Sequence, residues 1–82
     1  MKILYFSWLR EKIGVPFEEL EVTSSTVNDL IIELTKVDQK YALAFEDIKL
    51  LRVAVDQKVI HDLNISIKNA KEIAFFPPMT GG

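Results

Sequence analysis

Two short apolar segments near the ends of the chain constrain its fold more than any other feature. Residues Lys2–Trp8 and Glu72–Phe76 are rich in β-branched and aromatic side chains, which predicts a first and a last β-strand. Pro77–Pro78 ends the last strand, because proline cannot donate a hydrogen bond to a sheet ladder. Neither strand alternates cleanly between apolar and polar residues, so both carry apolar side chains on the two faces of the sheet.

The segments between these strands have more regular patterns. Residues Glu18–Val22 alternate between charged and apolar side chains and predict a second strand, paired with the first across the turn Gly14–Pro16. Thr26 is a candidate helix N-cap, and Asp29 is favourable near the positive end of that helix. Four apolar residues follow at helical spacing: Val27, Leu30, Ile31 and Leu34. The remaining predicted elements are a short helix at Tyr41–Phe45, strands at Leu50–Val55 and Lys58–Ile60, and a turn at Asn69–Lys71.

The order of these elements predicts an α+β fold. A hairpin, a helix and further strands give the β-grasp (ubiquitin-like) arrangement, in which a helix covers one face of a mixed sheet. The first and last strands then lie side by side at the centre of the sheet. We therefore expect a single domain over residues 1–82, from which residues 77–82 project as a C-terminal tail.

Coverage of one face leaves apolar side chains on the other. Phe6, Phe75 and Phe76 are not all expected in the core, because neighbouring strand residues face opposite sides. One interpretation is a patch that binds a partner, since large exposed apolar surfaces usually mark interaction sites. The alternative is that the Tyr41–Phe45 segment covers this second face.

Composition limits the classes of function. The 82 residues are 49% hydrophobic and include no cysteine, so an apolar core must hold the fold without a disulfide or a zinc–thiolate site. The net charge of −2 does not indicate a protein that binds nucleic acid, because such proteins carry concentrated basic residues. No apolar run approaches the ~18 residues of a membrane span and no signal peptide is visible, so we expect no membrane association and a cytoplasmic location.

Catalytic motifs are not found in the sequence. It contains no phosphate-binding glycine loop and no nucleophile-elbow serine. His61 has Asp62 beside it and Asp56 nearby, but a single histidine in a polar turn is typically solvated, so the sequence favours no metal site. We therefore expect neither catalysis by side chains nor a cofactor bound by this chain.

The C-terminal residues are the remaining candidate for chemistry. The chain holds three glycines, and two of them are Gly81 and Gly82. Without Cβ atoms they can lie extended in a narrow channel, where Thr80–Gly82 would span about 10 Å at ~3.3 Å per residue. Pro77–Pro78 stiffens the base of this tail. The terminal carboxylate is unreactive at neutral pH, but it becomes an acyl donor once a partner enzyme adenylates it.

The ending Phe75–Gly82 closely resembles that of the small subunits of molybdopterin synthase. Residues Tyr5–Glu11, Thr26–Val27, Tyr41–Asp47 and Arg52–Gln57 resemble the same family. The resemblance therefore covers the whole chain, and the ending is its most specific part.

This resemblance implies a sulfur carrier. An E1-like enzyme would use ATP to adenylate Gly82, and a sulfurtransferase system would convert the adenylate to a thiocarboxylate. The tail would then enter the large synthase subunit, which carries the catalytic side chains, and give sulfur to a cyclic pyranopterin precursor of the molybdenum cofactor. Two small and two large subunits form a heterotetramer in this family. Besides Gly82, the expected partner-binding residues are Phe6, Phe75, Phe76, Pro77, Pro78, Met79, Thr80 and Gly81.

Three other interpretations stay open. A sulfur carrier of the thiamine pathway shares the fold and the Gly-Gly ending, but such chains tend to lack the Phe-Pro-Pro segment. A protein modifier of the ubiquitin type typically ends on a basic tail instead of an apolar one. The third is an interaction domain whose Gly-Gly ending is incidental.

Overall fold

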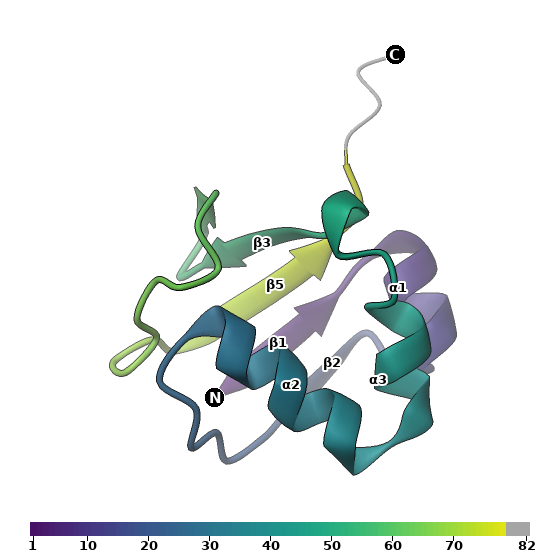
Figure 1. Ribbon diagram of the computed structural model, residues 1–82, viewed down its shortest axis with the longest axis horizontal. Helices are drawn as coiled ribbons and strands as arrows, with labels where there is room; N and C mark the ends of the chain where they lie inside the picture. The colour runs from purple at the N-terminus through teal and green to yellow at the C-terminus, as the bar shows by residue number, and fades with distance from the viewer. Residues whose placement is uncertain (79–82) are drawn as a thin grey trace.

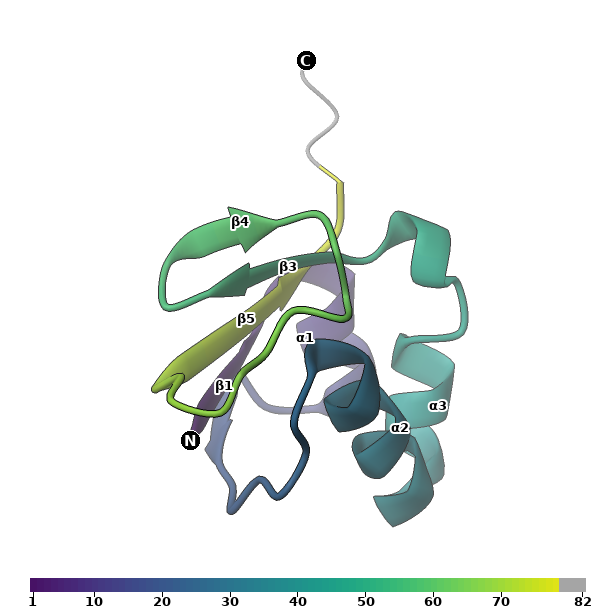
Figure 2. The same ribbon diagram turned by 60° about the vertical axis from the view of Figure 1, so that its left-hand side comes forward.

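The architecture is a mixed five-stranded sheet with helices on one side (Figures 1 and 2). A computed structural model describes residues 1–78. Its strands are β1 (Lys2–Tyr5), β2 (Phe17–Glu19), β3 (Arg52–Val55), β4 (Lys58–Ile60) and β5 (Glu72–Phe76). They are arranged in the order β2-β1-β5-β3-β4, with β1 and β5 parallel and the other pairs antiparallel. The prediction that the first and last strands are central neighbours is confirmed.

Three α-helices and one 3₁₀ helix accompany the sheet. They are α1 (Ser7–Ile13), α2 (Val27–Val37), α3 (Gln39–Ala44) and the 3₁₀ turn η1 (Ile48–Leu50). In Figure 2 the three α-helices lie on the same side of the sheet, and within residues 1–78 no helix lies on the opposite side. The α+β class and the one-sided coverage are confirmed, although three helices share the role predicted for one.

Helix α2 begins where the sequence predicts. The side-chain oxygen of Thr26 accepts a hydrogen bond from the backbone N–H of Asp29 at 3.1 Å, which satisfies one of the unpaired donors at the helix start. The four apolar residues at helical spacing are all buried: Val27, Leu30, Ile31 and Leu34. This stripe is what attaches the helix to the sheet.

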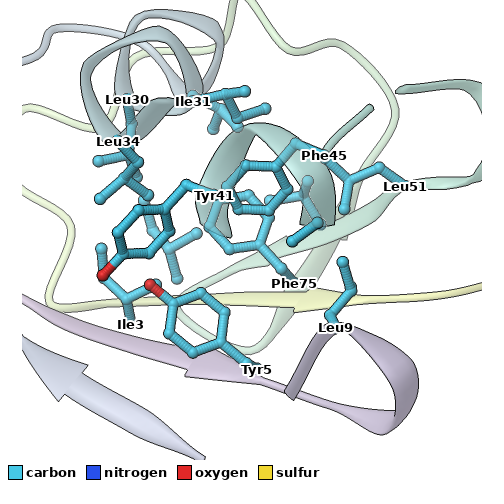
Figure 3. Packing of buried hydrophobic residues seen from close by; sticks show 14 of the residues in the cluster. Ile3, Tyr5, Leu9, Leu30, Ile31, Leu34, Tyr41, Phe45, Leu51 and Phe75 are labelled. Carbon is cyan, nitrogen blue, oxygen red and sulfur yellow. The ribbon is translucent and has the colours of Figure 1, made fainter. Parts of the chain in front are cut away.

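Aromatic rings fill the space between the sheet and the helices (Figure 3). The rings of Tyr5 and Phe75 stack with centroids 6.2 Å apart, and the ring of Phe45 lies 4.9 Å from that of Phe75. Tyr41, on α3, lies 6.4 Å from Tyr5. Helix α3 and Phe45 therefore pack on the same face as α2, and the alternative in which the Tyr41–Phe45 segment covers the second face is wrong.

The first strand is shorter than predicted. It ends at Tyr5 instead of Trp8, because Ser7 has a φ of 56° and turns the chain into helix α1. Leu9 and Ile13, four residues apart, bury one side of this helix. Gly14 ends it with a φ of 98° and an N–H that donates to the carbonyl of Arg10 at 2.7 Å, a conformation that favours glycine.

Two other strand boundaries differ from the prediction. The second strand spans Phe17–Glu19 instead of Glu18–Val22, because its ladder with β1 pairs only Phe17, Glu18 and Glu19, and the last bond beyond it is from Leu20 N–H to the carbonyl of Met1. The third strand begins at Arg52 instead of Leu50, because η1 occupies the residues before it. Pairing with β1 thus sets the first of these boundaries, and the local hydrogen bonds of the 3₁₀ turn set the second.

Candidate functional site

The end of the central strand is the root of the predicted tail. Strand β5 is flanked on both sides: Phe6 N–H donates to the carbonyl of Phe75 at 3.1 Å, and Arg52 pairs with Phe76 across the ladder to β3. Pro77 and Pro78 follow, half-buried. The strand that leads into this root, Phe76–Pro78, is thus held on both sides, by β1 and by β3. The predicted partner-contact residues Met79, Thr80 and Gly81, and the predicted sulfur-carrying Gly82, lie outside the described residues.

An apolar row crosses the sheet on the face without helices. Strand pairing aligns one residue from each strand, in the spatial order Phe17, Leu4, Ala74, Ala54 and Val59. Phe17 and Val59, at the two ends, are 51% and 55% exposed. We call these five residues the open-face row. Leu4 is half-buried and the two alanines are buried, so the exposed apolar surface of the row lies at Phe17 and Val59, and exposed apolar surface marks interaction sites.

The three phenylalanines singled out from the sequence have different environments. Phe6 is 47% exposed and lies beside the tail root, and Phe76 is half-buried. Phe75 is fully buried in the core against Tyr5 and Phe45. The prediction that not all three belong to the core is therefore confirmed. The assignment of Phe75 to the partner-binding set is wrong, because its side chain faces the helices.

Three members of the open-face row were not singled out from the sequence. Phe17 lies between the predicted turn Gly14–Pro16 and the predicted second strand, and Ala54 and Val59 are ordinary members of predicted strands. The detectable signal is alternation: Phe17 precedes Glu18, whose side chain faces the helices and accepts hydrogen bonds from Tyr5 and Tyr41. The alignment of the five residues becomes visible only once the order of the strands in the sheet is known.

The core face carries one polar cluster. The hydroxyls of Tyr5 and Tyr41 donate to Glu18 Oε2 at 2.8 Å and 2.6 Å. Burial, followed by the hydrogen bond to Glu18, raises the pKa of Tyr41 to about 12 and shifts the pKa of Tyr5 further upward. Both hydroxyls therefore stay protonated at neutral pH and act as hydrogen-bond donors. This cluster stabilises the fold and lies away from the open-face row.

The described residues do not assemble a metal centre. His61 is exposed at the end of β4, and among residues 1–78 no three His, Asp or Glu side chains lie close enough together to hold an ion. No helix in the same range is long and apolar enough to span a membrane.

Comparison with known proteins places the chain in a family. Residues 3–82 match the ThiS family. The chain belongs to this family. It is 43% identical over 82 residues to the molybdopterin synthase sulfur carrier subunit of Haemophilus influenzae, covering 100% of this chain and 99% of the relative. It is 37% identical, with the same coverage, to the molybdopterin synthase sulfur carrier subunit of Escherichia coli K12.

Solved structures share the fold of this ThiS-family chain. A putative molybdopterin converting factor subunit 1 from Pyrococcus furiosus superposes with a TM-score of 0.73 at 26% identity, covering 94% of each chain. The small archaeal modifier protein 1 of Methanosarcina acetivorans superposes with a TM-score of 0.71 at 25% identity, covering 99% of this chain and 94% of that one. Both likenesses support the ubiquitin-like arrangement of the sheet.

Proposed function

We propose that this chain is the sulfur carrier subunit of a molybdopterin synthase. The full-length similarity to two relatives with that name supports the role. The observation that carries the proposal is that the chain continues from the central strand β5, which is held by β1 and β3, through the root to Gly81 and Gly82, the third and fourth residues after Pro78. A rigid root followed by a slender ending suits delivery of a terminal group into a partner's active site.

The chemistry takes place on the carboxylate of Gly82. An E1-like enzyme joins a carboxylate oxygen to the α-phosphorus of ATP and releases pyrophosphate, which gives an acyl-adenylate. A sulfurtransferase system supplies sulfur as hydrosulfide, which attacks the acyl carbon and displaces AMP, so that a carbon–sulfur bond replaces the carbon–oxygen bond to AMP and a thiocarboxylate remains. Sulfur then moves to the pyranopterin precursor, and water returns the oxygen that regenerates the carboxylate. ATP binds to the activating partner, and this chain binds no cofactor of its own.

The large synthase subunit is the partner that covers the open-face row. The row lies on the same sheet as the tail root, so a protein that receives the tail also meets Phe6, Phe76 and the apolar surface beside them. Catalytic side chains belong to that large subunit, and two copies of each chain form a cytoplasmic heterotetramer.

Deletion of Gly82 tests the proposal. The shortened chain, incubated with the activating enzyme, ATP and a sulfide source, should form no thiocarboxylate, because the carboxylate is withdrawn by about 3 Å. A misplacement of about 1 Å already costs roughly 100-fold in rate. Intact mass measures the replacement of oxygen by sulfur, and dithiolene formation with the large subunit measures transfer. A wild-type rate of dithiolene formation by the shortened chain would refute the carrier role.

Two controls separate the carrier role from a folding defect and from other functions. The thermal midpoint should be unchanged by the deletion, because it leaves the packed core of residues 1–78 intact, and changes that leave the core intact alter stability by under ~0.5 kcal/mol. A second candidate function is protein modification, favoured by the likeness to the archaeal modifier protein. Isopeptide adducts on lysines of other proteins, formed without any pterin product, would support modification instead.

A further inference from the structure

A hollow beside the tail root has no role in the function proposed above. It has a volume of about 360 Å³, and its lining residues are Trp8, Lys12, Glu46, Asp47 and Leu50. We call it the Trp8 hollow. It combines an aromatic ring, two carboxylates and one lysine at a single surface position.

The topology brings this hollow to the end of the sheet where the tail begins. Strand β1 runs parallel to β5 and leads directly into α1, which carries Trp8. Strand β3 runs antiparallel to β5 and starts directly after η1, which carries Leu50. Both walls of the hollow therefore adjoin the strands on either side of Phe76, and Figures 1 and 2 place η1 at the same end of the molecule as the end of β5.

The hollow already holds a positive charge of its own. Lys12 Nζ lies 5.3 Å from the centre of the Trp8 ring and 3.6 Å from Glu46 Oε1. The side chains of Lys12 and Glu46 are 42% and 62% exposed, so this ion pair is weakly held. The Trp8 ring and the Glu46 carboxylate thus bind a cation, and a second cation can displace the one that they hold.

A second carboxylate leaves the hollow with excess negative charge. Asp47 is exposed, does not cap η1 with its side chain, and has no lysine or arginine nitrogen within 4 Å among the described residues. Two carboxylates therefore face one lysine. Leu50, 44% exposed, adds an apolar wall against which a long side chain can lie.

We propose that the Trp8 hollow binds an arginine side chain of the protein that receives the tail. A guanidinium stacks on an indole ring and bonds a carboxylate through two N–H groups at once, which matches the ring and the free Asp47 better than a lysine ammonium does. The inference rests on the proposed function, because a receiver of the tail necessarily comes close to the tail root. The hollow is then a second contact, distinct in chemistry from the apolar open-face row.

The single tryptophan of the chain makes a direct test possible. Labelling with 5-fluorotryptophan gives one fluorine signal, from Trp8. On titration with the purified large synthase subunit, this signal should shift as the complex forms. Asp47→Asn should raise the Kd about three- to tenfold at low salt, and the difference should shrink at high salt, where exposed charges are screened.

Matched variants keep the test specific. Glu21→Gln removes a carboxylate at the opposite end of the sheet, next to Leu20 and Met1, and should leave the Kd unchanged. Trp8→Leu should weaken binding as Asp47→Asn does, with thermal melting as the check on folding. If Trp8→Leu does not fold, the exposed Asp47→Asn variant decides the result by itself.

The possible outcomes distinguish the two proposals. If the complex forms while the Trp8 signal does not shift and Asp47→Asn binds like wild type, the hollow is not a contact. This result overturns the inference about the hollow and leaves the carrier role standing. If the wild-type chain neither binds the large subunit nor passes sulfur to the pterin, the carrier role fails, and the inference fails with it.

Discussion

Tyr5 and Tyr41, one from strand β1 and one from helix α3, donate hydrogen bonds to the same oxygen atom, Oε2 of Glu18. Glu18 belongs to the edge strand β2, so the shared acceptor ties a helix, a central strand and an edge strand together. Charge-assisted hydrogen bonds of this kind are stronger than neutral ones.

Removal of this acceptor should destabilise the fold. Glu18→Ala leaves two tyrosine hydroxyls without their partner, and each unsatisfied buried group costs about 1–3 kcal/mol. In a urea titration we expect the free energy of unfolding to decrease by at least about 1–3 kcal/mol. The matched control is Glu21→Ala, an exposed glutamate three residues away, for which a change under ~0.5 kcal/mol is expected. Equal effects of the two variants would show that the shared bond adds no stability.

The same cluster predicts a loss of stability at alkaline pH. The pKa of Tyr41 is raised to about 12 and that of Tyr5 is also raised, so the folded chain keeps both protons while the unfolded chain loses them near pH 10. For Tyr41 the stabilising effect is complete below pH 10 and is lost as the pH rises toward 12, whereas for Tyr5, whose pKa is raised further, the loss continues to higher pH. Its slope is about 1.4 kcal/mol per pH unit for each tyrosine. Urea unfolding at several pH values should therefore show a shallower decline for Tyr41→Phe than for wild type; parallel curves would contradict the assignment.

The β3–β4 turn predicts a stabilising substitution. Asp56 and Gln57 have φ values of 48° and 71°, a pair of left-handed residues in a two-residue hairpin turn, where glycine is preferred at the second position. Gln57→Gly should raise the free energy of unfolding by about 0.5–1 kcal/mol, measured by thermal melting.

Asp56 is the contrasting position in this turn. Its Oδ1 accepts hydrogen bonds from the N–H groups of Lys71 and Glu72 at 2.9 Å and 3.0 Å, which fixes the start of β5. Asp56→Gly should therefore destabilise the chain even though it relieves the same backbone strain. A stabilising effect of both glycine substitutions would mean that these two bonds contribute nothing.

The open-face row predicts a binding defect without a folding defect. Phe17 is 51% exposed at one end of the row, so Phe17→Asp removes little buried surface but places a charge on the proposed interface. The Kd for the large synthase subunit should rise at least tenfold, measured by calorimetry, with an unchanged melting temperature. Ile32→Asp, at a residue 45% exposed on the helical side, is the matched control and should bind normally. Equal losses for both would rule out the row as a specific interface.

The sequence predicted the fold class because its strongest signals are local. The stripe on α2, the N-cap Thr26 and the apolar strands at both ends determine element type without knowledge of contacts. Helix α1 was missed because Trp8 and Leu9 continue the aromatic and aliphatic run of the first strand. Only the left-handed backbone of Ser7, which no sequence rule requires, marks the change from strand to helix.

The candidate site was predictable in part. Phe6 and Phe76 could be assigned to a surface because they alternate with buried neighbours, but alternation alone does not say which face the helices cover. For this reason the sequence analysis assigned Phe75 to the partner-binding surface, although its side chain lies in the core. The open-face row and the Trp8 hollow each combine residues from distant segments, and their geometry follows only from the strand order.

The strand order also determines how the molecule responds to tension on its C-terminus. A pull on Pro77 acts along β5, which is hydrogen-bonded to β1 on one edge and β3 on the other. The force then shears both ladders at once, so many bonds must rupture together, whereas a pull across an edge strand would open its bonds one at a time. A partner that pulls on Pro77 along β5 therefore loads both ladders in shear instead of peeling a single edge.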